Sequence, residues 1–337
     1  MKEAMFYQHG KGNEVICGLC SHHCHIKEGK RGICGVRENQ DGKLYSLVYG
    51  RLVAKNSDPI EKKPLFHFLP GSSSFSIATV GCNFRCLHCQ NYDISQYPHL
   101  HSGEITGNED RAESVVEDAA RKGCASVCYT YVEPTIFYEF AYDCSILAHE
   151  RHLKNVFVSN GYMSPEVTRH LARVLDGINI DVKAFTDDFY KKVCKARLQP
   201  VLDNVRLMHE LGVWTEVTTL IIPGLNDSVE ELRDIAKFIK EVSPAIPWHV
   251  TAFYPTYKMM DRERTSAAIL RRARDIGLEE GLRFVYEGNI PGEGGENSYC
   301  PACGTELISR FGFSIRQNSL IDGCCNKCGE QIEGVWS

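Results

Sequence analysis

Residues 81–91 read GCNFRCLHCQN and bring three cysteines, Cys82, Cys86 and Cys89, into one loop. A closed tetrahedral metal site takes four protein ligands. An iron–sulfur cubane has four irons held by cysteine thiolates, so three cysteines would leave one iron open. A zinc knuckle completed by His88, or a set of redox-active thiols, are the alternatives. His88 is so close to Cys86 and Cys89 in the chain that tetrahedral geometry is hard to reach.

The composition narrows the class of protein. With 337 residues, 43% of them hydrophobic, the chain is long enough to bury a sizeable core. A formal net charge of -5 gives no basic field, so nucleic acid is not an expected partner. No stretch approaches the roughly 20 apolar residues of a membrane helix, and the N-terminal residues lack the apolar run of a signal peptide. We therefore expect a cytoplasmic protein with no membrane partner, in which sixteen cysteines indicate metals or catalysis rather than disulfides.

The middle of the chain alternates strand-like and helix-like patterns. Ser228 and Glu231, for example, form a capping box before an amphipathic helix. Repeated strand–helix units indicate a parallel sheet with helices outside it. There are fewer units than the eight of a closed TIM barrel, so we expect an α/β protein with a partial (β/α)6-type TIM barrel; a doubly wound open sheet is the alternative. The expected strands are residues 74–80, 124–132, 155–160, 178–185, 213–222, 249–254 and 283–286.

Polar residues cluster where the predicted strands end, which is where barrel enzymes place their chemistry. Asp181 and Lys183 share one strand face, and two opposite charges there are costly unless they are paired or bind a ligand. Less specific roles are a solvated loop carboxylate for Glu133, a turn residue for Asn160, a structural ion pair for Asp181 and Lys183, and a buried, satisfied imidazole for His249.

The central motif, Cys82-x-x-x-Cys86-x-x-Cys89, resembles that of the radical S-adenosylmethionine (SAM) superfamily. The runs YTYVEPTIFYE, VSNGY, DVKAF and IIPGLND follow it in the order found in activating enzymes of glycyl-radical proteins. With DPIEKKPLFHFLPG before the motif and two CxxCG motifs after it, the chain is most similar to the AmmeMemoRadiSam system radical SAM enzymes. The core of that group is similar to pyruvate formate-lyase activating enzyme.

The resemblance implies that Cys82, Cys86 and Cys89 hold a catalytic [4Fe-4S] cluster whose open iron binds SAM. One electron, from a donor such as flavodoxin or ferredoxin, then cleaves SAM to methionine and a 5′-deoxyadenosyl radical, which abstracts hydrogen from a substrate. The substrate, a protein or a small molecule, is not identified by the sequence. A protein glycine is the alternative that the activating enzymes suggest, and a non-catalytic zinc-binding adaptor is the alternative of another class.

The resemblance also implies the SAM contacts. Glu133 follows the second strand, where the family has a Gly-Gly-Glu-like motif, but this chain has Tyr131 and Val132 in place of the glycines. The implied contacts are Glu133 with the ammonium, Lys183 with the carboxylate, Asp181 with the ribose, Ser159 and Asn160 with ribose or carboxylate, the strand at Thr219 with adenine, and His249 with SAM or substrate.

Two further cysteine groups flank this core. CPACG (300–304) and CNKCG (325–329) have the spacing of a zinc ribbon, for which we expect structural zinc, with a rubredoxin-like iron as the alternative. The N-terminal group also has four ligands; we favour structural zinc, with an auxiliary iron–sulfur cluster as the alternative. The expected domains are residues 1–73, 74–290 and 291–337. The C-terminal group is Cys300, Cys303, Cys325 and Cys328, and the N-terminal group is Cys17, Cys20, Cys24 and Cys34.

Overall fold

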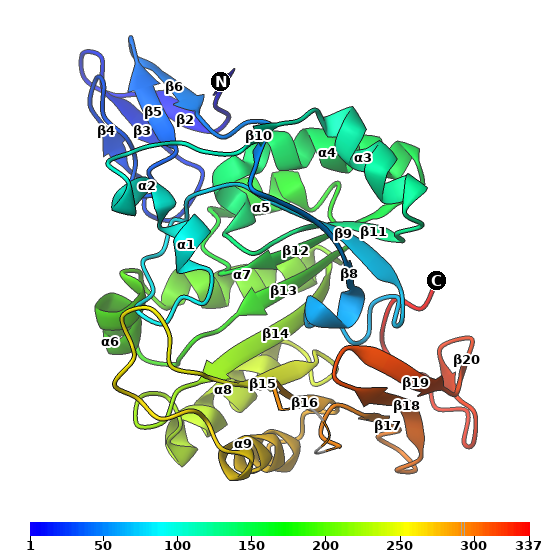
Figure 1. Ribbon diagram of the computed structural model, residues 1–337. Coiled ribbons are helices and arrows are strands. Elements are labelled where there is room, and N and C mark those ends of the chain that lie inside the picture. The colour runs from blue at the N-terminus through cyan, green and yellow to red at the C-terminus, as the bar shows by residue number, and fades with distance from the viewer. Residues whose placement is uncertain (291, 293) are drawn as a thin grey trace.

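The computed structural model describes all residues except 291 and 293 and is built around one eight-stranded sheet (Figure 1). The strand order is β16-β15-β14-β13-β12-β11-β9-β8. Neighbours from β9 to β16 run parallel, whereas β8 runs antiparallel to β9. In the described part of the chain β8 and β16 are the sheet edges, so the sheet does not close. The strands are β8 (Ala54–Pro59), β9 (Ser73–Ala78), β11 (Ser126–Tyr129), β12 (Lys154–Ser159), β13 (Gly177–Asp181), β14 (Trp214–Ile221), β15 (Trp248–Ala252) and β16 (Val285–Gly288).

The α/β prediction is confirmed, with one addition at the sheet edge. The parallel strands coincide with the apolar runs in the sequence. Strand β8 was not expected, because its residues, AKNSDP, are mostly polar and show no apolar alternation. It pairs with β9 along its whole length and so covers what would otherwise be an open edge of the parallel sheet.

Helices follow the strands and cover the outer face of the sheet (Figure 1). The predicted capping box before α8 is half present: Ser228 Oγ accepts a hydrogen bond from Glu231 N at 3.2 Å, while the Glu231 carboxylate accepts from Phe185 N at 2.7 Å. The apolar face of α8, including Leu232 and Ile235, is fully buried. The helices are α1 (Tyr92–Ser95), α2 (Tyr97–Leu100), α3 (Ala112–Arg121), α4 (Tyr138–Glu150), α5 (Pro165–Leu171), α6 (Asp187–Phe189), α7 (Gln199–Glu210), α8 (Val229–Val242) and α9 (Ala267–Glu279), with shorter turns η1 (Ile60–Lys62), η2 (Pro134–Phe137) and a π-helix, η3 (Tyr190–Cys194). None of the described helices is both long and apolar enough to cross a membrane.

The N-terminal residues form small antiparallel sheets at one end of the large sheet (Figure 1). Arg37 and Glu139 lock them to α4 through two charge-assisted hydrogen bonds of 2.8 and 3.1 Å, and both side chains are buried. The strands are β1 (Lys2–Glu3), β2 (Tyr7–His9), β3 (Val15–Cys17), β4 (His25–Ile26), β5 (Arg37–Gln40), β6 (Lys43–Ser46) and β7 (Arg51–Leu52), which pairs with β10 (Asn108–Glu109).

The C-terminal residues form a second group of short antiparallel strands at the other end (Figure 1). Buried Arg310 joins them to the segment between β8 and β9 by donating to Phe66 O at 2.9 Å. The predicted start of this segment, residue 291, lies outside the described residues, and the three domain boundaries stay predictions. The strands are β17 (Ser298–Tyr299), β18 (Glu306–Phe311), β19 (Ser314–Asn318), β20 (Leu320–Ile321) and β21 (Cys324–Cys325).

Candidate active site

The loop after β9 carries the three central cysteines, Cys82, Cys86 and Cys89, and is fixed by backbone hydrogen bonds. Arg85 N donates to Cys194 O and Leu87 N donates to Val193 O, each at 3.0 Å. These bonds tie the loop to the π-helix η3, which follows β13. The cysteines are thereby held at the carboxyl end of the parallel strands, as the sequence predicts.

A cavity of about 510 Å³ opens at this end of the sheet. Its volume lies within the usual range for small-molecule sites, roughly 300–1,000 Å³. Loops after five strands contribute to its wall, so residues far apart in sequence share one site. Of the predicted site residues it is lined by Cys82, Cys86, Cys89, Glu133, Ser159, Asn160, Asp181 and Lys183.

The carboxylate of Glu133 is buried and organises two strand ends. One oxygen accepts from Ser159 Oγ at 2.9 Å and from both the backbone and the hydroxyl of Thr135; the other accepts from Asn160 N at 2.7 Å. Burial raises the pKa of Glu133, and these donors act against that rise. Among the described residues, the second oxygen has a single protein donor, which leaves it capacity for a further donor in the cavity.

Tyr131 lies where the resembling family has a glycine, and it adopts the backbone conformation that glycine would. Its φ is 65°, in the left-handed region that costs a non-glycine residue roughly 1 kcal/mol. Its hydroxyl donates to Asp58, and the ammonium of Lys63 lies 4.8 Å from its ring centroid. The turn that presents Glu133 is therefore formed here without the two glycines.

Asp181 and Lys183 form an ion pair of 2.7 Å in the cavity wall. Burial disfavours the ammonium, but the negative charges of Asp181, Cys86 and Cys194 together outweigh it and hold the pKa of Lys183 well above its ordinary value. Lys183 is therefore a permanent cation in the cavity. Its backbone N–H donates to Tyr190 of η3 at 3.0 Å, which fixes the strand end.

The cavity wall also contains two polar atoms with no protein partner among the described residues, Thr218 Oγ1 and His88 Nδ1. A buried polar group without a partner is costly, and its presence in a cavity indicates a place for a ligand. Three thiolates, a carboxylate, a cation and a free hydroxyl fit a three-cysteine cluster with SAM. Burial lowers the pKa of His88 to about 3, so its ring is neutral.

The zinc-knuckle alternative for the central loop is not supported by the structure. Among the described residues, no three ligand atoms of the central loop, His88 included, lie within 4.8 Å of one another. The loop therefore does not assemble the compact ligand set that one zinc ion needs.

Two predicted site residues lie apart from the cavity wall. The hydroxyl of Thr219 donates to Val182 O at 2.8 Å and accepts from Trp248 Nε1 at 2.9 Å, so its side chain is occupied in the core. His249 pairs with the buried carboxylate of Glu216 at 2.6 Å. The expected ligand contact of His249 is corrected by this geometry: it is the buried, satisfied histidine. For Thr219, only the backbone contact remains a prediction.

Sequence reasoning missed several lining residues. Thr218, Thr251 and Lys62 line the cavity, and Cys194 lies beside Cys86. A hydrogen bond from the Cys194 thiol lowers the pKa of Cys86. The period-2 rule could have indicated Thr218, because it lies one position from Thr219 and faces the opposite side of β14. Nothing in the sequence indicated that η3 would bring Cys194 to the central loop.

The C-terminal cysteine group is compact. Cys300 and Cys328 have sulfurs 3.6 Å apart, and those of Cys303 and Cys325 are 3.7 Å apart. Four thiolates about 2.3 Å from one tetrahedral ion lie roughly 3.8 Å from one another, so this group fits a single ion.

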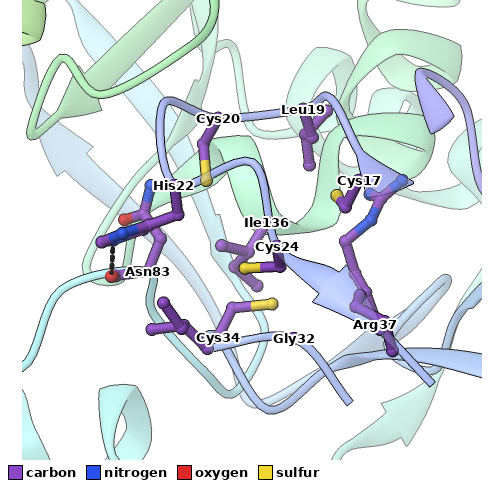
Figure 2. A pocket seen from close by; sticks show the side chains of 12 residues that line it. Cys17, Leu19, Cys20, His22, Cys24, Gly32, Cys34, Arg37, Asn83 and Ile136 are labelled. Carbon is purple, nitrogen blue, oxygen red and sulfur yellow. Dashed lines mark hydrogen bonds between the residues drawn. The ribbon is translucent and has the colours of Figure 1, made fainter. Parts of the chain in front are cut away.

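The N-terminal cysteine group lines a second, smaller cavity (Figure 2). Aliphatic side chains, among them Leu19 and Ile136, complete its wall. The ring of His22 at its edge bonds to Asn83 O at 2.8 Å, one residue from Cys82.

An open parallel sheet with a three-cysteine loop and a charged cavity at its carboxyl end defines a radical SAM type of site. The family model of the radical SAM superfamily matches residues 76–239. The chain belongs to the radical SAM superfamily.

Two relatives and one solved structure are similar to the chain. The chain is 47% identical over 338 residues to the uncharacterized protein MJ0808 of Methanocaldococcus jannaschii, covering 99% of this chain and 100% of that protein. It is 26% identical over 222 residues to the pyruvate formate-lyase-activating enzyme of Clostridium pasteurianum, covering 61% and 89%. The structure of Streptococcus suis SuiB bound to S-adenosylmethionine has a TM-score of 0.52 at 15% identity and shows the same fold over 68% of this chain, which spans about half, 53%, of SuiB.

Proposed function

We propose that the chain is a radical SAM enzyme that takes a hydrogen atom from a substrate. Cys82, Cys86 and Cys89 would hold a [4Fe-4S] cluster, which would supply the one electron needed to cleave SAM into methionine and a 5′-deoxyadenosyl radical. The observation that carries this proposal is the cavity itself, in which the three cysteines share a wall with Glu133, Asp181 and Lys183. A non-catalytic adaptor has no use for that arrangement.

The cavity residues match the groups of SAM. Glu133 Oε2, with its single protein donor, accepts from the ammonium. Lys183 meets the carboxylate, and Asp181, one-third exposed, is open to the ribose hydroxyls. Ser159 and Asn160 are positioned by Glu133, and the backbone of β14 near Thr219 offers a surface for adenine. Each contact replaces water with a fixed charge or dipole, which orients SAM for cleavage.

Glycyl-radical activation is the second candidate. It is favoured by the similarity to the pyruvate formate-lyase-activating enzyme of C. pasteurianum, which covers 61% of this chain. In that case the hydrogen donor is the backbone Cα of a partner protein. In either case, an external one-electron donor of the flavodoxin or ferredoxin class supplies the cluster. The compact C-terminal cysteine group is proposed to hold structural zinc, because its sulfur spacing fits one tetrahedral ion.

The substrate class can be tested by following the hydrogen. Reduced protein and SAM are incubated anaerobically with deuterium-labelled cell extract that has been divided by size filtration into macromolecular and small-molecule fractions. Deuterium in 5′-deoxyadenosine from the macromolecular fraction alone supports a protein substrate, and from the small-molecule fraction alone a metabolite. Unlabelled 5′-deoxyadenosine with every fraction contradicts hydrogen abstraction from a cellular substrate.

A further inference from the structure

The four sulfurs of the N-terminal cysteine group face one enclosed space (Figure 2). Cys17 ends β3, Cys20 and Cys24 lie in the loop between β3 and β4, and Cys34 follows the turn at Gly32. Cys17 and Cys34 are buried, and Cys20 and Cys24 are half-buried. Four thiols, aliphatic side chains and the polar groups of His22, Arg37 and Asn83 line this space, with no acidic residue among them, and the thiols can hold a thiolate-bound metal centre.

The distances between the sulfurs distinguish a site for a single metal ion from a site for an iron–sulfur cubane. In the C-terminal group all four ligand atoms lie within 4.8 Å of one another, as one tetrahedral ion requires. Within the described residues, no three sulfurs of the N-terminal group meet that limit, and neither do the three central cysteines. A cubane carries each thiolate on a different iron and therefore holds its ligands farther apart than a single ion does. By this measure the N-terminal group resembles the central cysteines and differs from the C-terminal group.

The N-terminal site is also built onto the central loop. Gly81, the residue before Cys82, passes so close to the Cys34 segment that a Cβ on it would lie 3.0 Å from Cys34 O. Two residues further along, Asn83 O bonds to the ring of His22 at 2.8 Å. The start of the central loop therefore contacts the N-terminal site at two positions, Gly81 and Asn83.

The same segment contacts the loop after β12. Ser21 N donates to Tyr162 O at 3.0 Å, and Ser164 N donates to Leu19 O at 3.2 Å. This loop begins with Ser159 and Asn160, which line the central cavity. The N-terminal site and the central site thus share two loops of the barrel rim.

We propose that Cys17, Cys20, Cys24 and Cys34 hold a second [4Fe-4S] cluster next to the central one. With a thiolate on each iron, this cluster offers no open position to SAM or substrate, unlike the central cluster. The assignment replaces the structural zinc that the sequence alone favours for this group. It goes beyond the proposed function, because it rests on ligand spacing and not on SAM chemistry.

The test uses the full chain, purified anaerobically, with iron, sulfide and zinc measured by elemental analysis and cluster type by Mössbauer spectroscopy. We expect roughly eight irons and about one zinc in the wild-type protein. The variant with Cys82→Ala, Cys86→Ala and Cys89→Ala together should stay brown and retain about half the iron as a [4Fe-4S] cluster. The EPR signal of its reduced cluster should not change when SAM is added.

A matched variant adds Cys20→Ala and Cys34→Ala to that background, and we expect it to lose the remaining iron while keeping its zinc. A colourless central variant with about two zinc ions would overturn the proposal, as would wild-type protein with about four irons and two zincs. The wild-type measurement decides the question even where a variant fails to fold. Failure of SAM cleavage with both clusters present would count against the proposed function and leave this assignment standing.

Discussion

Thr218 and Thr219 are neighbours on β14, yet their hydroxyls have opposite environments. Thr218 Oγ1 lies in the wall of the central cavity with no protein partner among the described residues. Thr219 Oγ1, on the other face, bonds to Val182 O and to the indole of Trp248. The Thr218 hydroxyl is therefore available to a ligand, whereas the Thr219 hydroxyl contributes to the stability of the core.

Thr218→Val should weaken SAM binding with little effect on the free energy of unfolding, because no protein hydrogen bond is lost. Thr219→Val should lower the free energy of unfolding by roughly 1–3 kcal/mol, because it leaves the buried Trp248 N–H unsatisfied. Equilibrium dialysis with SAM and urea unfolding measure the two effects. Equal losses of affinity and stability in both variants would contradict the assignment of the cavity wall.

Lys183→Met should raise the dissociation constant of SAM about tenfold or more, corresponding to roughly 1.4 kcal/mol, because it removes the cation that we propose pairs with the SAM carboxylate. The cluster absorbance should not change, since Lys183 is not a ligand. Lys192→Met is the control, because Lys192 is exposed and pairs with Asp188 on the surface. Unchanged SAM affinity in Lys183→Met would assign the Asp181–Lys183 pair a structural role.

Gly81→Ala should destabilise the contact between the N-terminal segment and the central loop. Its φ is 100°, and a Cβ would lie 2.6 Å from Val36 Cγ1. We expect a loss of roughly 1–3 kcal/mol and faster proteolysis within the N-terminal segment. Gly123→Ala is the matched control: its φ is also positive, at 65°, but a Cβ there meets nothing within 4 Å. Equal proteolysis of the two variants would argue against a tight junction at Gly81.

We expect His67 to make the attachment of the C-terminal strands sensitive to pH. Its ring bonds to Glu333 O at 2.7 Å and to the Tyr286 hydroxyl at 2.5 Å, and burial lowers its pKa to about 4. Between pH about 6.5 and 4 the unfolded chain binds a proton at His67 that the folded chain does not, so the stability falls as the pH falls.

The measurement compares the free energy of unfolding of the wild type and His67→Gln across this range, with metal loading held equal. Glutamine keeps a donor and an acceptor but does not titrate. Relative to the variant, the wild type should lose up to about 3 kcal/mol on going from pH 6.5 to 4. Parallel pH profiles of the two proteins would refute a neutral, buried His67.

The sequence predicts the parallel strands well, because apolar runs of β-branched residues in β12, β13 and β14 are buried as expected. It does not reveal β8, which is polar and defined only by pairing with β9. Helix α4 was also missed: Tyr138, Glu139, Phe140 and Ala141 are all buried in succession, so no amphipathic period appears.

In the site, too, contacts that depend on strand pairing could not be predicted from the sequence. Cys82, Glu133, Asp181 and Lys183 could be placed together because each follows a strand end. The partner of His249 could not be predicted, because Glu216 lies earlier on a neighbouring strand and only the strand register brings the two together.

The central claim is that the three-cysteine loop makes the chain a SAM-cleaving enzyme. The most direct test is to incubate anaerobic, dithionite-reduced protein with SAM and to quantify 5′-deoxyadenosine and methionine by mass spectrometry. The wild type should form both in equal amounts, Cys86→Ala should form neither, and Cys324→Ala, outside all three cysteine groups, should match the wild type. Colourless wild-type protein that forms no 5′-deoxyadenosine, or a Cys86→Ala variant that forms as much as the wild type, would contradict the account.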